Sequence, residues 1–177
     1  ASLVPPNLRP ETGANANRPS PSSTRANSAT VRSTVTWLPF LAFATGMDDP
    51  KGLAMIGKDL YVADKARILK VMPDGKWQVF AAADAFPATP QFLNDLESDK
   101  QGNLYVSDSG DLKKGGAIYR ISKTGKVTLI TDGKKDERVL APNGLLMDRR
   151  GKLLEVDFSS GILYRLNIAS GEMVQIA

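Results

Sequence analysis

Asn94 and Asp95 are the residues whose chemical type stands out most from the surrounding pattern. They lie in the segment FLNDLESD, which alternates apolar residues with amide and carboxylate side chains that β-strands normally avoid. The following segment, NLYVSD, comes after a turn-like DKQG and is an ordinary strand sequence. Side-chain oxygens at the mouth of a hairpin have two explanations: they bind a ligand, or they cap a turn.

The residue types that are absent limit the chemistry of such a site. The 177 residues include no cysteine and no histidine. Disulfides, thiolate metal sites, cysteine nucleophiles, Ser-His-Asp catalysis and imidazole-rich zinc sites are therefore excluded within this sequence. Acid–base or metal chemistry must use carboxylates, amides, hydroxyls, Lys or water. Oxygen ligands of this kind favour calcium or magnesium.

The distribution of charge and apolar residues narrows the possible partners. The net charge is +4, of which residues 1–35 contribute +3, so the rest of the chain is nearly neutral. No Lys/Arg stripe with interleaved aromatic residues is present, and no nucleic-acid partner is expected. The most apolar stretch, WLPFLAFATGM, is too short to span a bilayer and lacks the basic flank of a signal peptide. We expect a soluble protein, with a cytoplasmic location favoured.

From about residue 35 onward the sequence repeats three times. Segments beginning at Pro50, Leu93 and Pro142 each contain an apolar run, a Gly-containing turn and a strand that ends in Asp. A second strand (ILKVM, AIYRI, ILYRL), another turn (PDGK, KTGK, ASGE) and a final strand follow. Four short strands in about 40 to 50 residues are typical of a β-propeller blade. One Asp recurs in every repeat, which predicts a shared structural hydrogen bond: Asp64, Asp108 and Asp157.

The predicted organisation is a disordered tail followed by a partial all-β propeller of about three four-stranded blades. The tail is residues 1–35, rich in Pro, Ser, Asn, Thr and Ala, and the propeller is residues 36–177, with TWLPFLAF at 36–43 as an outer strand. The expected blades are approximately 48–82, 91–133 and 139–177. An open stack would expose apolar faces, so either chains self-associate through the open blade edge or the chain is part of a longer one. The end of the chain at GEMVQIA favours truncation.

Four segments of the repeat carry its most specific residues: DDPKGLA, FLNDLESDKQGNLYVSDSGD, GGAIYRIS and APNGLLMDRRGKLLEVD. Together they resemble the N-terminal half of the gluconolactonase, regucalcin (senescence marker protein) and lactonase-related family of six-bladed β-propellers. The resemblance covers about residues 36–177 and depends mainly on FLND and PNGL, some 50 residues apart. The shorter motifs LYVAD and DGK also occur in other propellers, including NHL-repeat proteins.

The resemblance implies a divalent cation, most often calcium, held in the central channel by Asn and acidic side chains. Asn143 in PNGL matches a direct metal ligand, and Asn94 matches a residue that ligates the metal or contacts substrate. Asp48 stands two residues before a Pro, the offset of the family's N-terminal acidic ligand, although that ligand is usually Glu. Asp95 is expected on the substrate side of the site. The family's remaining carboxylate ligand, which is also its proposed base, comes from a later blade beyond residue 177.

Structural alternatives exist for several of these residues. Asp95 also suits a role in accepting backbone N–H groups at the channel end, and Asp48 also suits a surface turn. The first repeat has Lys51 at the position of Asn94 and Asn143, so two of the three blades place an amide there.

These residues and the resemblance predict a calcium-dependent, lactonase-type hydrolase of a small-molecule lactone, incomplete in this chain. Calcium would polarise the lactone carbonyl, and a carboxylate would take a proton from the attacking water. Two alternatives are an NHL-like, non-enzymatic propeller that binds a protein or ligand, and an inactive truncated homologue. The first of these alternatives predicts no metal dependence.

Overall fold

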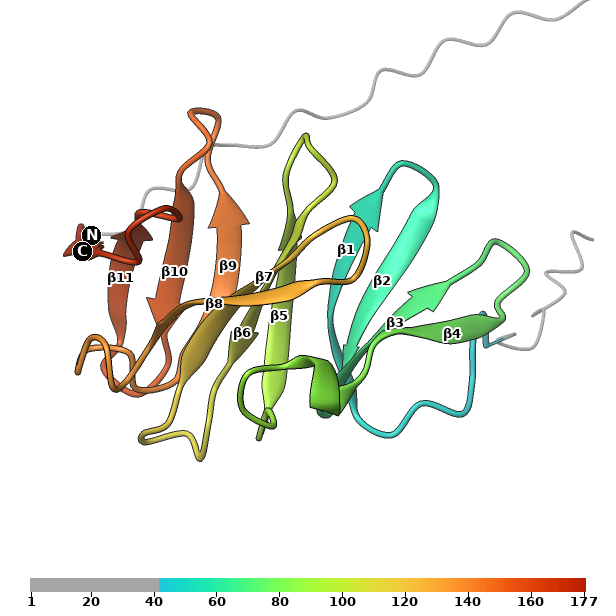
Figure 1. Ribbon diagram of the computed structural model, residues 1–177, viewed down its shortest axis with the longest axis horizontal. Helices are drawn as coiled ribbons and strands as arrows, with labels where there is room; N and C mark the ends of the chain where they lie inside the picture. The colour runs from blue at the N-terminus through green and yellow to red at the C-terminus, as the bar shows by residue number, and fades with distance from the viewer. Residues whose placement is uncertain (1–41) are drawn as a thin grey trace, which may run out of the picture. The chain divides into compact units, whose positions relative to one another are not determined.

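The computed structural model describes residues 42–177 of the chain (Figure 1). The predicted tail at 1–35 and most of the predicted outer strand at 36–43 lie outside this range; the two described residues of that strand, Ala42 and Phe43, are not in a strand. Among residues 42–177, no helix is long and apolar enough to cross a membrane. The described elements are a 3-10 helix at Ala83–Ala85 and the strands β1 (Pro50–Ile56), β2 (Asp59–Asp64), β3 (Arg67–Val71), β4 (Trp77–Ala81), β5 (Leu93–Ser98), β6 (Leu104–Asp108), β7 (Ala117–Ile121), β8 (Val127–Asp132), β9 (Pro142–Met147), β10 (Leu153–Asp157), β11 (Ile162–Leu166) and β12 (Met173–Gln175).

The strands form three antiparallel sheets of four, each a meander in which neighbours in sequence are hydrogen-bonded. We call β1–β4 the first blade, β5–β8 the second and β9–β12 the third. The prediction of an all-β fold made of four-stranded propeller blades is confirmed. The first strands of the blades (β1, β5 and β9) pack side by side, and we call them the inner strands. The arrows of β1 and β9 point the same way in Figure 1, so these strands begin at the same end of the molecule.

The second blade is buried on both faces, which explains why β6 consists entirely of buried residues. Successive side chains of a strand point to opposite faces of the sheet. Val106 accordingly packs in the core between the first and second blades, with Tyr61 and Ile68. Tyr105 packs in the core between the second and third blades, with Leu153. Apolar residues on both faces of one blade therefore join its two neighbours.

Asp residues form the hairpin turns at DKQG, where the sequence predicts a turn, and at DRRG. Asp99 Oδ1 accepts the backbone N–H groups of Gln101 and Asn103, at 2.9 Å each. Asp148 Oδ1 accepts those of Arg150 and Lys152, at 2.8 Å each. These backbone bonds lower the pKa of the Asp148 carboxyl because they stabilise its charged form. These bonds fix the turns between β5 and β6 and between β9 and β10.

The inner strands approach each other closely where the side chain between them is small. A Cβ atom on Gly52 of β1 would lie 2.5 Å from the Cα atom of Asp95 and 2.6 Å from the carbonyl oxygen of Asn94. Such distances are well inside van der Waals contact, so only glycine allows this approach. Gly144 of β9 occupies the equivalent position in the third blade, and a Cβ atom there would meet no described atom within 4 Å.

Candidate metal-binding site at the inner strands

The recurring Asp residues fix the start of each inner strand. Asp64 Oδ1 accepts the backbone N–H of Asp49 at 2.7 Å. Asp108 accepts the N–H groups of Gln91 and Phe92 at 3.1 and 2.8 Å. In the third blade Asp157 Oδ2 accepts the N–H groups of Leu140 and Ala141 at 3.0 and 2.7 Å. The predicted shared structural hydrogen bond is confirmed, since each Asp holds the chain that leads into the inner strand.

This arrangement brings Asn94 and Asn143 to equivalent places on neighbouring strands. Each follows the residue that is paired with the recurring Asp: Leu93 with Asp108, and Pro142 with Asp157. Asn94 Nδ2 donates to Ser109 Oγ at 3.1 Å, and Ser109 Oγ donates to the carbonyl oxygen of Pro142 at 2.7 Å. Two hydrogen bonds in series thus connect the side-chain amide of Asn94, through Ser109, to the backbone of Pro142, the residue before Asn143.

The side-chain amide of Asn143 differs from that of Asn94 in its partners. It is half-buried, and within residues 42–177 it has no hydrogen-bond partner. Its backbone carbonyl oxygen is held by Ser107 Oγ, which donates to it at 2.6 Å. The backbone of Asn143 is therefore held in place, whereas no residue in the range 42–177 engages its side-chain amide.

Asp95 holds two blades together. Its Oδ2 atom accepts the backbone N–H of Leu145 on β9 at 2.8 Å, and its Oδ1 atom accepts the N–H of Leu96 at 2.9 Å. Glu97, two residues later in β5, makes an equivalent bond between the blades: its Oε2 atom accepts the backbone N–H of Met147 at 3.0 Å. With both oxygens engaged, Asp95 is suited to joining the second and third blades, and its predicted contact with substrate remains a prediction.

Asp48 lies in a different environment from the two amides. Its exposed carboxylate is 3.4 Å from Nη2 of Arg67 on β3, and Arg67 also binds Asp64. The recess around Asp48 is lined by residues of the first blade and of the chain after it, and neither Asn94 nor Asn143 lines it. Within residues 42–177, no group of three or more acidic residues is placed to hold a metal ion. The structure therefore brings together the predicted amide ligands but not the predicted carboxylate.

Lys51 occupies the amide position of the first blade, and its charge is compensated locally. Its ammonium group forms an ion pair with the carboxylate of Asp49 and also donates to the Asp49 carbonyl oxygen at 3.3 Å. The ammonium lies 4.1 Å from the centre of the Phe92 ring, a cation–π contact with the second blade. The first blade thus contributes a paired cation where the other two contribute amides.

Glu155 is a buried carboxyl group that the repeat pattern did not explain. It replaces the Val of the other two blades, lies between Leu145 and Tyr164 across the sheet, and is fully buried. Neither carboxylate oxygen has a hydrogen-bond partner among residues 42–177. Burial, together with the nearby charge of Asp157, raises the pKa of Glu155 to about 8. Glu155 is therefore largely neutral below that pH.

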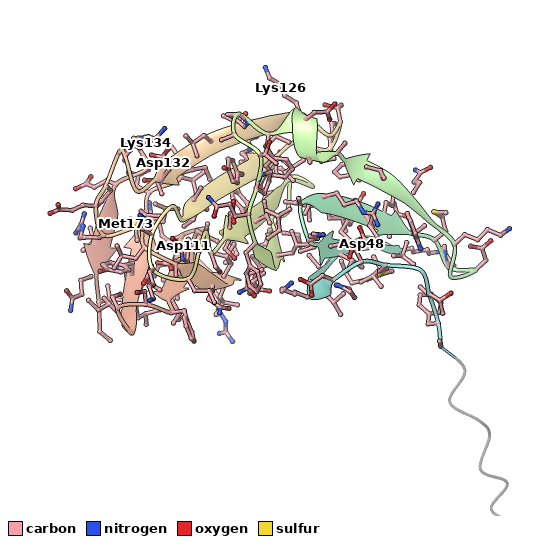
Figure 2. The ribbon with its side chains drawn as sticks, turned by 90° about the horizontal axis from the view of Figure 1, so that it is seen from below. Asp48, Asp111, Lys126, Asp132, Lys134 and Met173 are labelled. Carbon is pink, nitrogen blue, oxygen red and sulfur yellow. The ribbon has the colours of Figure 1, made fainter. Side chains whose placement is uncertain are left out.

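A hollow of about 400 Å³ lies at the end of the second blade, beside the chain that leads into β5 and β9. Gln91, Asp108 and Leu140 line it, together with Lys114 and Lys134 from two loops. Figure 2 shows this end of the molecule. Asp132, at the end of β8, and Lys134, in the loop that follows, lie close together, apart from Asp48 at the first blade. The volume is in the range of small-ligand pockets, and the rim is charged.

The sequence matches the family model described as the SMP-30/Gluconolactonase/LRE-like region over residues 16–175. The chain belongs to this family. The match begins about 20 residues before the resemblance found from the motifs, so the family region includes part of the predicted tail. Three β-propeller blades and a family of gluconolactonase type agree with the sequence-based expectation.

Individual relatives are more distant, and each is longer than the matched part. The STRICTOSIDINE SYNTHASE-LIKE 3 protein of Arabidopsis thaliana is 29% identical over 116 residues, which are 64% of this chain and 28% of the relative. A gluconolactonase from Xanthomonas campestris is 22% identical with a TM-score of 0.60, over 76% of this chain and 49% of that one. The virginiamycin B lyase of Staphylococcus aureus is 18% identical with a TM-score of 0.58, over 72% and 40%. The chain thus spans half or less of each.

Proposed function

We propose that this chain carries the N-terminal part of the active site of a calcium-dependent, lactonase-type hydrolase. The observation that carries the proposal is the side-chain amide of Asn143, which has no hydrogen-bond partner among residues 42–177 and lies on the inner strand next to the one that bears Asn94. Membership of the gluconolactonase-type family supports a small-molecule lactone as substrate. Amide oxygens suit a divalent cation because they coordinate it without neutralising its charge.

The residues of this chain would hold and orient the site. Asn143 would supply one oxygen ligand, and Asn94, turned by its bond to Ser109, would supply another or position substrate. A bound divalent cation supplies Lewis acidity toward the lactone carbonyl. Asp95 is a poor candidate for the base because both of its oxygens accept backbone N–H groups. The resemblance assigns the base to a later blade, so we propose that a complete site needs more residues than these.

Calcium binding is tested by thermal unfolding with calcium chloride and with excess chelator. A ligand that binds only the native state raises its stability by mass action, so calcium should raise Tm and the chelator should reverse the shift. Asn143→Ala should abolish the shift. The exposed Gln101 provides the control, because Gln101→Ala also removes an amide but lies at a hairpin tip. An unchanged calcium response in Asn143→Ala would reject the site.

Catalysis is tested separately, by hydrolysis of sugar lactones in a chain extended through the later blades. The wild-type extended chain should be active with calcium, and both Asn143→Ala and chelator should remove the activity. Equal hydrolysis in all three conditions would reject the mechanism, whatever the binding result.

The second candidate is a non-enzymatic propeller of the NHL type. It is favoured by Lys51 in the amide position of the first blade and by the pairing of Asp48 with Arg67, since both reduce the acidic character of the site. This candidate predicts no effect of calcium or chelator on Tm. The same unfolding curves therefore decide between the two.

A further inference from the structure

The turn that follows each inner strand carries a cationic side chain. The turns and their cations are 57–58 with Lys58, 99–103 with Lys100, and 148–152 with Arg149 and Arg150. The arrows of β1 and β9 in Figure 1 point to this end of the blades, whereas Asn94 and Asn143 lie where their strands begin. The cations of successive turns are 42 and 49 residues apart in the sequence, so no basic run marks them. Only the fold gathers them at one end.

A hollow of about 360 Å³ lies between the turns of the second and third blades. Lys100, Arg149 and Arg150 line its charged side, and Met147 and Ile168 add apolar surface. Both walls belong to neighbouring blades that pack on each other, so the hollow is part of a contact inside the described range. Its volume is in the range of small-ligand pockets.

The two acidic residues that line the hollow, Asp99 and Asp148, are engaged by their own turns. In addition to its two backbone bonds, Asp99 accepts Nδ2 of Asn103 at 2.7 Å and the hydroxyl of Tyr105 at 2.9 Å. Asp148 Oδ1 accepts two backbone N–H groups of its turn. The three cations of the hollow form no ion pair with any residue in the range 42–177. The carboxylates thus fix the turns on which the cations stand and do not neutralise them by direct contact.

One backbone N–H in each of these two turns also has no acceptor among the described residues. The first residue of each turn donates to the carbonyl oxygen of the last, and Asp99 or Asp148 accepts three further N–H groups through its side chain or carbonyl oxygen. The remaining N–H belongs to Lys100 in one turn and to Arg149 in the other. Backbone N–H groups and Arg side chains are both common donors to phosphate oxygens.

We propose that this hollow binds a phosphate monoester group attached to a small organic body. A phosphate monoester carries nearly two negative charges at neutral pH, so more than one cation is needed to balance it. The guanidinium groups of Arg149 and Arg150 can each donate two parallel N–H···O bonds, and Lys100 adds a point charge. Met147 and Ile168 provide the apolar surface on which the organic body packs.

Two features limit what the hollow accepts and where it acts. The three turns contain no aromatic residue, so a nucleic-acid base has nothing to stack on here. Asn143 and Asp148 are five residues apart along an extended strand, a separation of about 15 Å, so the hollow is distinct from the candidate metal site. The inference therefore does not depend on calcium binding or lactone hydrolysis.

Isothermal titration with phenyl phosphate, in phosphate-free buffer with excess chelator, tests the hollow. The chelator removes any contribution from calcium, so this proposal and the calcium site succeed or fail separately. The exposed double variant Arg149→Gln/Arg150→Gln should weaken binding by about 10-fold or more. Lys58→Gln/Lys126→Gln removes the same charge from exposed turn residues outside the hollow and should leave binding nearly unchanged. No binding to wild type at about 10 mM ligand, or an equal loss in both double variants, would overturn the proposal.

A soluble molecule and a lipid headgroup both carry this chemical group, and a second measurement distinguishes them. Phosphatidylcholine vesicles with phosphatidic acid, which bears a phosphate monoester, are sedimented with the protein in the presence and absence of glycerol phosphate. Titration without sedimentation would assign the hollow to a soluble phosphate. Sedimentation that glycerol phosphate competes for, and that Arg149→Gln/Arg150→Gln loses, would assign it to the lipid. Sedimentation unchanged in that variant would overturn the assignment of the hollow.

Discussion

Oδ2 of Asp95 accepts the backbone N–H of Leu145 at 2.8 Å, and this bond joins the inner strand of the second blade to that of the third. The contact explains why a strand interior carries a residue with low strand propensity. A carboxylate reaches farther than Val or Thr and accepts the N–H of a strand that belongs to another sheet.

Removing this carboxylate should destabilise the fold. Asp95→Ala leaves the N–H of Leu145 without its acceptor, and we expect the free energy of unfolding to fall by about 1–3 kcal/mol. Urea unfolding measures the change. Glu137→Ala is the control, since Glu137 is an exposed loop carboxylate. Equal urea midpoints for Asp95→Ala and wild type would show that the bond between the blades contributes nothing.

Glu155 should make the stability of the protein depend on pH. Its folded pKa of about 8 exceeds its usual 4.5, so the folded state retains a proton that the unfolded state loses between these values. Stability from this group is complete below pH 4.5 and is lost as the pH rises to about 8. Glu155→Val, which restores the residue of the other blades, should raise the free energy of unfolding at pH 9 by about 3–5 kcal/mol.

Urea unfolding at pH 5 and pH 9 tests the prediction about Glu155. The gain from Glu155→Val should be clearly smaller at pH 5, where the buried carboxyl is neutral. Glu137→Gln removes a surface carboxylate and should not change the difference between the two pH values. A pH-independent gain would mean that packing alone, and not ionisation, distinguishes Val from Glu at this position.

Gly52 and Gly144 offer a comparison between equivalent positions. Gly52→Ala should lower the free energy of unfolding by about 1–3 kcal/mol, because its Cβ atom would clash with the backbone of Asp95. In Gly144→Ala the new Cβ atom would meet no described atom within 4 Å, so this variant should cost much less. Both are measured by urea unfolding. Equal losses for the two variants would contradict the close approach of β1 and β5.

Tyr105 and Tyr119 should ionise late in an alkaline titration. Burial raises the pKa of Tyr105 and of Tyr119 to about 12, and in Tyr105 the hydrogen bond to Asp99 adds to the effect. Since these values exceed 10, the stability that they contribute is lost as the pH rises from 10 to 12. Tyrosinate absorbance follows the ionisation. Asp99→Asn should lower the pKa of Tyr105 in part, and no shift would show that burial acts alone.

Periodic features were accessible from the sequence, and contacts between blades were not. The hairpins, the four-strand repeat and the recurring Asp bonds follow from local residue patterns. The partner of Asp95, by contrast, lies 50 residues away, so its binding to Leu145 required the fold. The orientation of Asp48 toward Arg67 depends on how β3 is placed, and the sequence offset before Pro50 did not reveal it. Ser107 and Ser109 were missed, although SDS replaces ADK and VDF of the other repeats.

The contact between the first and second blades and the contact between the second and third blades differ in how they resist force. Four side chains of the second blade bind the backbone of β9, whereas among residues 42–177 one such bond, from Ser98 to the carbonyl oxygen of Met55, links β5 to β1. Directional bonds resist sliding along the strands, and apolar contacts yield to it more easily. Under a pulling force the first blade should therefore detach before the second and third separate, which makes the latter pair the last unit to lose its structure.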